Sequence, residues 1–296
     1  MGSSSSDQKK PTILVTGANG QVGKELRQLE KSWPQYQFLF LSREDLPIHH
    51  FELVRRYFEA VHPDYLINCA AYTAVDKAES ERDLAYQINA EAVGVLAAIC
   101  HQQQCRLIHI STDYVFDGTA TRPYREDDSC APRSVYGASK WEGEKLAMQY
   151  DPNSIIVRTS WVYSSFGKNF VKTILRLLQE KPALSVVNDQ VGSPTYAADL
   201  AEALLLIISA KNWKSGIYNY SNTGNISWFD FAVAIAKLKQ STVPIQGIST
   251  AQYPTAAHRP AYSVLDTSKI NQTFHVPIKD WRESLAHCLS FCTVNT

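Results

Sequence analysis

The sequence predicts an α/β protein with a doubly wound, mainly parallel sheet of the Rossmann-like kind and a smaller, interleaved C-terminal α/β domain. Short runs rich in β-branched and aromatic residues alternate with segments of helical period, and a glycine-rich turn follows the first run. Strand and helix repeated in this way specify a parallel sheet with helices on both faces, because right-handed crossovers place them there.

The expected elements follow one another in a regular order. Strands are expected over residues 12–16, 38–42, 65–70, 106–112, 154–160 and 216–221. Helices are expected over residues 21–32, about 51–60, about 80–103, from about 134, 169–179, about 197–210, 228–238, 266–273 and 279–290. Ser227, with Asp230 three places on, forms a capping box that marks the start of the helix WFDFAVAIAKL.

The strand and helix alternation loosens after residue 160, which predicts a second domain. The loop NDQVGSPT contains glycine and proline, and later segments return to the sheet. We expect residues 11–165 with about 193–222 to form a dinucleotide-binding domain. Residues about 166–192 with 223–296 are expected to form a substrate-binding domain. Residues 1–10 are polar and serine-rich and are expected to be a disordered leader.

Composition argues against several classes of function. The 296 residues carry 29 basic and 29 acidic side chains, so no net charge draws the protein to nucleic acid or an anionic membrane. No run of about 18 apolar residues occurs and the leader lacks the apolar stretch of a signal peptide, so a cytoplasmic location without a membrane partner is expected. The six cysteines lack C-x-x-C spacing, which indicates reduced thiols and no metal site.

A glycine-rich turn after the first strand predicts a dinucleotide site. Gly17, Gly20 and Gly23 allow a tight turn and close backbone approach, so a pyrophosphate can rest on the N–H groups that open the helix. The second strand ends in Ser42 and Arg43, where a domain that prefers NAD carries an acid for the ribose. Arg43 is either a ligand for a 2′-phosphate or a solvated side chain, so NADP is the preferred cofactor and NAD stays open.

Three polar side chains predict carbonyl chemistry at the end of the fourth strand. Thr112 ends that strand, and Tyr136 and Lys140 stand one helical turn apart in SVYGASK. Ketone reduction needs a hydride donor and a proton for the developing alkoxide. Tyr136 is the expected acid, Lys140 the ribose anchor whose ammonium lowers the pKa of the phenol, and Thr112 the group that polarises the carbonyl. Taken alone, Thr112 is equally compatible with a structural threonine.

Six motifs in order along the chain resemble the dTDP-4-dehydrorhamnose reductase family of extended short-chain dehydrogenases. They are TGANGQVG, NCAAYTAVDKAE, STDYVFDG, VYGASKWEGE, RTSWVYS and NDQVGSPT, with a weaker echo in HRPAYSVLD. The resemblance implies NAD(P)H-dependent reduction of the 4-keto group of dTDP-4-dehydro-6-deoxy-L-mannose to dTDP-L-rhamnose. The expected partner is therefore a small nucleotide-sugar substrate.

The resemblance also implies roles for individual residues. The cofactor pyrophosphate is expected at Gly20, Gln21 and Val22. The expected contacts along the cofactor beyond the third strand are Ala71, Tyr72 and Thr73. The expected substrate contacts are Thr112, Asp113, Trp161, Asn169 and Arg259, the last for the nucleotide phosphates. An indole offers a flat apolar face to the C–H side of a sugar ring, although a core position for Trp161 also stays open.

The chain departs from the family pattern at several positions. Some members dimerise around a magnesium ion held by glutamates; Glu25 matches one of these, but Ala198 stands where a second is expected. No metal site is therefore expected, and monomer and homodimer both stay open. Pro47 stands where an aspartate is usual, which leaves the adenine contacts unassigned.

Rival functions differ in the residues they need. The 4,6-dehydratases carry an Asp-Glu pair after the threonine, whereas Asp113 is followed here by Tyr114, which disfavours elimination. Other nucleotide-sugar epimerases and reductases share the tyrosine and lysine. A regulatory subunit resembling that of methionine adenosyltransferase would bind NADP without turnover. Reduction fits the residues best, with these as the alternatives.

Overall fold

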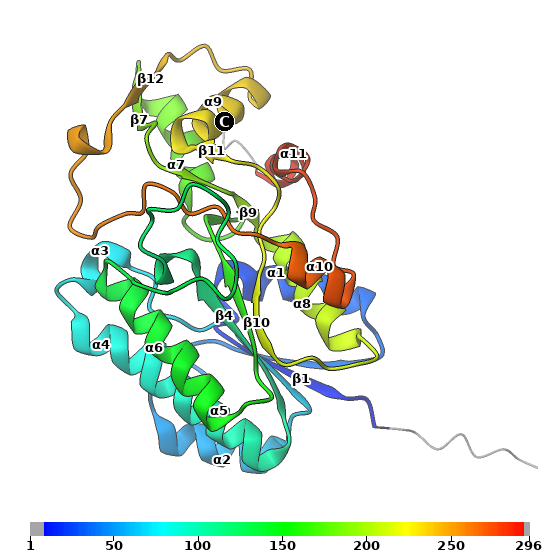
Figure 1. Cartoon of the computed structure of the whole chain (residues 1–296). Helices are drawn as coiled ribbons and strands as arrows, with labels where there is room; N and C mark the ends of the chain where they lie inside the picture. The colour runs from blue at the N-terminus through cyan, green and yellow to red at the C-terminus, as the bar shows by residue number, and fades with distance from the viewer. Residues whose placement is uncertain (1–8, 293–296) are drawn as a thin grey trace, which may run out of the picture.

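A six-stranded parallel sheet forms the centre of the computed structural model, which describes residues 9–292 (Figure 1). The strand order is β2-β1-β3-β4-β5-β10, and each neighbouring pair runs parallel. The strands are β1 (Thr12–Thr16), β2 (Gln37–Leu41), β3 (Tyr65–Asn68), β4 (Arg106–Thr112), β5 (Ile155–Thr159) and β10 (Gly216–Asn219). The order reverses between β1 and β3, the point at which open α/β sheets bind ligands.

Helices cover both faces of this sheet, which confirms the doubly wound fold. One face carries α1 (Gln21–Leu29) and α8 (Ala197–Ser209); the other carries α2 (Phe51–Val61), α5 (Ala92–Gln103) and α6 (Val135–Tyr150). Along β1, Ile13 and Val15 join the first core, whereas Leu14 joins the second. Successive residues of a strand point to opposite faces, so one apolar run supplies both cores.

The single helix expected over residues 80–103 is wrong in detail. The chain forms α3 (Val75–Ala78), α4 (Arg82–Tyr86), a π-helical turn (Gln87–Glu91) and then α5. A Cβ at Gly143 would lie 2.0 Å from the Asn89 carbonyl oxygen, so α6 packs directly on the π turn. A π turn shifts the helical register by one residue, which apolar periodicity does not reveal.

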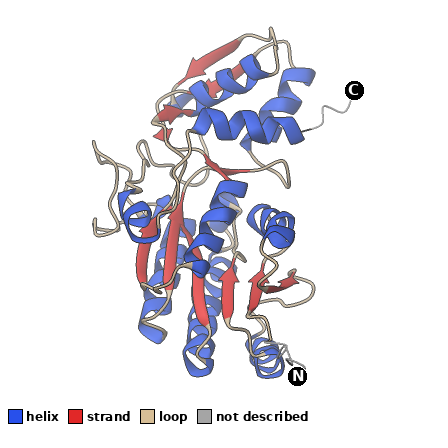
Figure 2. Cartoon of the chain, turned by 90° about the vertical axis from the view of Figure 1, so that its right-hand side faces the viewer, coloured by secondary structure: helices blue, strands red, loops and turns tan. Residues whose placement is uncertain are grey.

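A smaller lobe stands beyond the carboxyl ends of the strands, and we call it the second lobe (Figure 2). Its core lies between α7 (Phe170–Glu180), α9 (Trp228–Leu238) and α11 (Trp281–Phe291). Paired strands complete it: β6 (Val162–Tyr163) with β9 (Thr195–Tyr196), β7 (Leu184–Val187) with β12 (Ile245–Ile248), and β8 (Val191–Gly192) with β11 (Ile226–Ser227). Both hydrogen bonds of the capping box between Ser227 and Asp230 open α9, as expected.

We propose the domain boundaries that the sequence suggested, with one exception. Residues about 193–222 supply α8 and β10, which pack in the sheet domain. The exception is α10 (Ser268–Phe274), because Ile270 and Phe274 are buried in the sheet-domain core although they follow the second lobe in the chain. The expectation for residues 1–8 of the leader lies outside the described residues.

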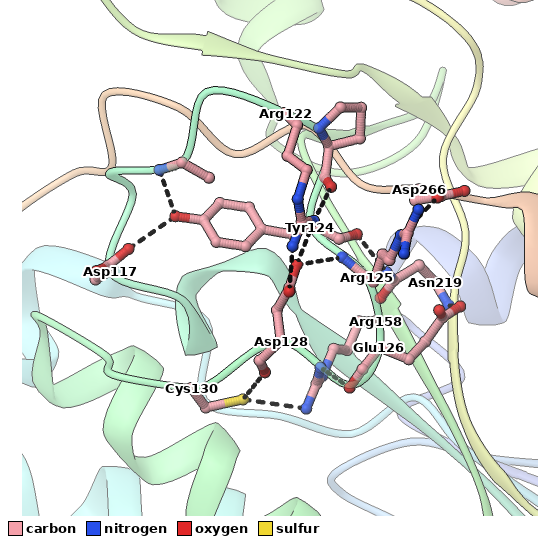
Figure 3. Close-up of polar contacts among 12 residues, drawn as sticks. Asp117, Arg122, Tyr124, Arg125, Glu126, Asp128, Cys130, Arg158, Asn219 and Asp266 are labelled. Atoms are coloured by element: carbon pink, nitrogen blue, oxygen red, sulfur yellow. Dashed lines mark hydrogen bonds and ion pairs between the residues drawn. The ribbon is translucent and has the colours of Figure 1, made fainter.

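A loop after β4 ties the sheet to the segment between β12 and α10 (Figure 3). Arg158 at the end of β5 is buried and pairs with Glu144 of α6 at 2.7 Å, while its Nη1 donates to the Glu126 carbonyl at 3.2 Å. Asn219 at the end of β10 donates from its backbone to Glu126 and from its side chain to the Tyr124 carbonyl, each at 2.9 Å. A buried charge left without its partner is costly, so the ion pair with Glu144 holds the Arg158 guanidinium in place. The loop is then held because its Glu126 carbonyl accepts from that guanidinium.

None of the helices in the described part of the chain combines the length and apolarity that a membrane span requires.

Candidate active site

A cavity of about 860 Å³ lies where the carboxyl ends of the strands face the second lobe. One side of it is formed by the first turn, the segments after β2 and β3, the end of β4 and the start of α6. The opposite side is formed by residues around β6 and by the first residue of α9. The predicted site residues that line it are Gly17, Gly20, Gln21, Val22, Arg43, Ala71, Tyr72, Thr73, Thr112, Asp113, Tyr136, Lys140 and Trp161.

The turn between β1 and α1 has the backbone geometry of a phosphate cradle. Gly17 has a positive φ of 65°, and a Cβ there would lie 2.7 Å from the Ala70 nitrogen. A Cβ at Gly23 would lie 2.6 Å from the Ala18 Cα. Gly20 caps α1 without a side chain, so the first N–H groups of this helix face the cavity end without a competing cap. These residues fit a dinucleotide pyrophosphate.

The two residues after β2 that were expected to contact the cofactor ribose, Ser42 and Arg43, lie in different surroundings. Arg43 and Glu44 are exposed and line the cavity, together with the half-buried His49. Burial lowers the pKa of His49, and His50 and Arg43 add to this effect. Ser42 is buried outside the lining, where its hydroxyl accepts from the Glu44 and Asp45 backbones at 3.2 and 3.3 Å. Both remain predicted cofactor contacts, and only Arg43 is free to meet a 2′-phosphate.

The segment after β3 is held by a residue that sequence reasoning missed. Asn89, in the π turn, accepts from the Tyr72 nitrogen at 2.8 Å and donates to the Tyr72 carbonyl at 3.1 Å. Its amide also donates to the Ser139 hydroxyl of α6 at 3.0 Å. The signal available in the sequence was a lone asparagine within an apolar helical stretch, because a buried amide there needs partners. Asn89 thereby links the expected cofactor loop to the helix that carries Tyr136.

The start of α6 brings the predicted catalytic side chains to the end of β4. The Ser134 hydroxyl caps the helix by accepting from the Gly137 nitrogen at 3.1 Å. A Cβ at Gly137 would lie 2.2 Å from the Tyr114 carbonyl oxygen, so the first turn of α6 rests on the 3-10 turn Asp113–Val115. This close packing places Tyr136 beside Thr112.

The pKa of Tyr136 departs from expectation. Burial raises it to about 12, the Thr112 hydroxyl opposes the rise, and the Asp113 carboxylate adds to it. Burial lowers the pKa of Lys140 to about 8. The expectation that the Lys140 ammonium lowers the phenol pKa is therefore wrong, because burial disfavours the charged form of both groups. Tyr136 is a protonated phenol at neutral pH and has a proton to give.

Thr112 and Asp113 form a connected pair in the cavity wall. The Thr112 hydroxyl donates to Asp113 Oδ1 at 2.9 Å and accepts from the Tyr114 nitrogen at 3.2 Å. Burial raises the pKa of Asp113 to about 6, although the nearby Ser263 and Thr112 hydroxyls oppose this. Asp113 Oδ2 is buried and has no hydrogen-bond partner within residues 9–292. That oxygen is enclosed by the protein, so a contact between Asp113 and the substrate stays a prediction.

Two stacked indoles form the opposite wall. Trp161 has a positive φ of 47° and stacks on Trp228, with ring centroids 3.5 Å apart and planes 8° apart. A Cβ at Gly192 would lie 2.6 Å from Trp161 Cε2, so only glycine fits behind the ring. Trp228 also lines the cavity and was missed, because its distance of 67 residues from Trp161 hides the contact.

Two of the weaker substrate predictions lie outside the cavity lining. The Asn169 amide donates to Gln21 Oε1 at 2.8 Å, and its oxygen accepts from the Lys172 nitrogen as the cap of α7. The Arg259 guanidinium pairs with both oxygens of Asp76 at 3.0 and 2.8 Å. Both residues therefore already have protein partners, and their contacts with substrate remain predictions.

Glu25 matches a glutamate that binds magnesium in some family members, so its surroundings are relevant to whether a metal site forms. Glu25 is buried and accepts from the Ser164 hydroxyl at 2.6 Å, and burial raises its pKa. Within residues 9–292, His, Cys, Asp and Glu side chains do not gather in groups of three or more that could hold a metal ion.

The fold and the cavity define the class of protein. A glycine turn that opens α1, a hydroxyl at the end of β4, and a tyrosine and lysine one helical turn apart on α6 meet around one cavity of a Rossmann-like sheet. This arrangement is that of a short-chain dehydrogenase/reductase of the extended type, in which a second lobe completes the site.

Comparison with known proteins narrows the class to a family. Residues 11–293 match the family model described as RmlD substrate binding domain. The dTDP-4-dehydrorhamnose reductase of Aggregatibacter actinomycetemcomitans is 41% identical over 289 residues, covering 94% of this chain and 98% of the relative. The chain therefore belongs to the dTDP-4-dehydrorhamnose reductase family.

Solved structures of similar proteins agree with this family assignment. The dTDP-4-dehydrorhamnose reductase from Clostridium acetobutylicum superposes with a TM-score of 0.91 at 41% identity, covering 94% of this chain and 98% of that one. The enzyme from Bacillus anthracis, in complex with NADP, also has a TM-score of 0.91, at 39% identity, covering 95% of this chain and 99% of that one.

Proposed function

We propose that this chain reduces the 4-keto group of dTDP-4-dehydrorhamnose with NAD(P)H and forms dTDP-L-rhamnose. The observation that carries the proposal is one cavity that joins the glycine cradle at Gly17 to Thr112, Tyr136 and Trp161. Near full-length similarity to reductases of this name supports the substrate. The alternative of a regulatory subunit has no such support, and the cavity retains the groups that turnover needs.

A nicotinamide cofactor supplies the hydride when it is bound. We propose that the N–H groups at the start of α1, with Gln21 and Val22, hold its pyrophosphate, and that Ala71, Tyr72 and Thr73 lie along the cofactor. Arg43 is the exposed cation at the far end of the cavity, so it supports a preference for the 2′-phosphate of NADP. Glu44 lies beside it and keeps NAD as a usable alternative, because a carboxylate suits a free ribose hydroxyl.

We propose that Tyr136 delivers the proton. Its phenol stays protonated at neutral pH because burial raises its pKa to about 12, so it can donate to the oxygen that becomes an alkoxide. The Thr112 hydroxyl carries one hydrogen, so it supports that oxygen by donating to it in place of Asp113 Oδ1. Asp113, ionised above about pH 6, accepts from Thr112 until the keto oxygen takes that hydrogen, and we propose that it contacts the sugar. Trp161 presents an apolar face to the sugar ring.

The test is turnover with defined reactants. Purified protein is mixed with NADPH and dTDP-4-dehydrorhamnose, and nicotinamide absorbance is followed; we expect oxidation stoichiometric with dTDP-L-rhamnose. A second dTDP-4-dehydrorhamnose reductase confirms that the substrate is competent. Cofactor binding without oxidation under those conditions would contradict the proposal and favour a regulatory protein.

The cellular location and the oligomeric state are two further proposals. We propose a cytoplasmic location, supported by the chemistry of a nucleotide-sugar substrate and a nicotinamide cofactor. We also propose a monomer or homodimer without a shared magnesium ion, supported by Ala198 where a ligand glutamate would be needed. Light scattering after size exclusion, with and without EDTA, measures the mass; a dimer that dissociates in EDTA would contradict the second proposal.

A further inference from the structure

A chain of buried polar side chains runs behind the catalytic residues. It starts at Thr16 on β1, passes through Asn68 on β3 and His109 on β4, and ends at Lys140 on α6. The exposed fractions of these residues are 1%, 0%, 0% and 2%. Each is hydrogen-bonded to the next, at 2.7 Å, 3.0 Å and 3.1 Å. His109 does not line the cavity, so the proposed reaction has so far given this buried, titratable group no role.

The hydrogen-bond network fixes the orientation of the Asn68 amide. Its Oδ1 accepts from the Ala70 nitrogen at 3.2 Å and from the Thr16 hydroxyl at 2.7 Å. A backbone N–H can only donate, so the atom that faces Ala70 must be the oxygen. The other end of the amide, Nδ2, therefore donates to His109 Nδ1 at 3.0 Å.

This orientation also assigns the proton of His109. Burial, together with Lys140, holds the pKa of His109 well below its ordinary value, so the ring is neutral and carries a single N–H. Because Nδ1 accepts from Asn68, that proton lies on Nε2. The Nε2–H then faces Lys140 Nζ at 3.1 Å.

An N–H aimed at Lys140 Nζ favours the amine over the ammonium. The amine has one lone pair to accept from His109 and still donates to the Ile110 carbonyl at 2.7 Å. The ammonium has three N–H groups, so two donors would face one another at His109. The other titratable groups near Lys140 are Cys69 after β3, and Tyr136 and Glu144 on its own helix, of which Glu144 is paired with Arg158.

We propose that His109 is a positioning residue for the reductase site: it anchors Lys140 Nζ at the cavity wall and, in the tautomer that Asn68 imposes, disfavours the ammonium. Burial lowers the pKa of Lys140 to about 8, which agrees with this arrangement. The consequence is a lysine that exchanges its proton near neutral pH while its position stays fixed. The arrangement of His109 and Lys140 does not depend on the proposed function. Only the reaction in which this lysine takes part, reduction of the keto sugar, rests on it.

The sharpest test inverts the tautomer with Asn68→Asp. A carboxylate accepts from Ala70, from Thr16 and also from His109, so the proton of His109 moves to Nδ1 and Nε2 becomes an acceptor for the Lys140 ammonium. The pKa of Lys140 then rises, and the ammonium persists to higher pH. We expect the midpoint of the Lys140 titration to rise by about one pH unit, the scale on which one charge-assisted contact shifts a pKa.

Two readouts follow Lys140 without turnover. Trace acetylation of Lys140 at a series of pH values, quantified by mass spectrometry, reports the fraction of amine without any ligand. The dissociation constant of NADPH, from the quenching of tryptophan fluorescence, should increase through the same midpoint as the ammonium is lost. Failure to reduce the keto sugar would contradict the proposed function alone and would leave both titrations readable.

A matched pair of variants distinguishes two ways in which Asn68→Asp could raise the pKa of Lys140. One acts through the His109 ring, and the other is direct attraction between the new carboxylate and the ammonium. His109→Phe keeps a planar ring but removes both nitrogens, so Asn68→Asp added to it should shift the midpoint by less than about 0.3 pH unit. An equal shift with either residue at position 109 would overturn the proposal. If Asn68→Asp fails to fold, His109→Gln offers Lys140 a carbonyl acceptor and should raise the midpoint; an unchanged midpoint in folded His109→Gln would overturn it as well.

Discussion

The two walls of the cavity are built in different ways. The sheet wall consists of Gly17, Thr112, Tyr136 and Lys140 with their neighbours, and the lobe wall consists of Trp161 and Trp228. In the sheet wall, backbones approach so closely that a methyl group would collide, at Gly17 and at Gly137. Chemistry that depends on a fixed distance between hydride donor and proton donor requires such rigid support.

The lobe wall depends on side chains stacked across the fold. Trp161 holds a positive φ, Gly192 leaves room behind it, and Trp228 covers one of its faces at 3.5 Å. A non-glycine residue in this backbone region stores strain that its surroundings must offset. Changes in the sheet wall should therefore affect chemistry and cofactor binding, whereas changes in the lobe wall should affect sugar binding.

The largest effect is expected from Tyr136→Phe, which removes only the hydroxyl of the proposed acid. Turnover should fall by about 10²-fold or more, with little change in the KM for the sugar. Steady-state rates with NADPH measure this. Tyr150→Phe is the control, because Tyr150 is exposed at the other end of the same helix. Activity of Tyr136→Phe within a few-fold of the parent would remove Tyr136 from the mechanism.

The next largest effect is expected from Gly17→Ala in the cradle. A Cβ there meets the Ala70 backbone, so the dissociation constant of NADPH should rise by about tenfold or more, and the melting temperature should fall. Gly216→Ala is a matched control, since Gly216 also has a positive φ, of 129°, but no atom within 4 Å of the added Cβ. It should lose about 1–3 kcal/mol of stability from backbone strain alone and keep its affinity for NADPH. Equal loss of affinity in both variants would refute the cradle.

An intermediate effect is expected from Trp228→Ala in the lobe wall. Loss of the stack frees Trp161, so the KM for the nucleotide sugar should rise by about tenfold while the dissociation constant of NADPH changes by less than about threefold. Trp228→Phe keeps an aromatic face and should recover most of the affinity. If NADPH binding weakens as much as sugar binding does, the two walls are not separate in function.

The smallest effect is expected from Arg43→Ala at the far end of the sheet wall. Loss of this cation should lower kcat/KM for NADPH by about five- to tenfold and change that for NADH by less than twofold, because only NADPH carries the 2′-phosphate. Arg55→Ala on α2, also exposed, controls for general loss of positive charge. A parallel decrease with both cofactors would show that Arg43 does not read the 2′-phosphate.

The sequence by itself determined the sheet fold and most of the sheet wall. Alternating apolar runs specify parallel strands, and the carboxyl ends of parallel strands meet at one edge, so Gly17 and Thr112 could be placed together from their positions alone. Tyr136 and Lys140 could be paired because a helix repeats every 3.6 residues. These inferences use local periodicity, which a single chain displays directly.

Only the tertiary structure decided the remaining features. The Trp161–Trp228 stack and the two-residue strands of the second lobe join residues far apart in the chain, and no local pattern signals them. The π turn that carries Asn89 shifts register by one residue, below what periodicity resolves. The pKa of Tyr136 rises rather than falls because burial disfavours the phenolate, and burial is a property of the packed fold and not of the spacing of two residues.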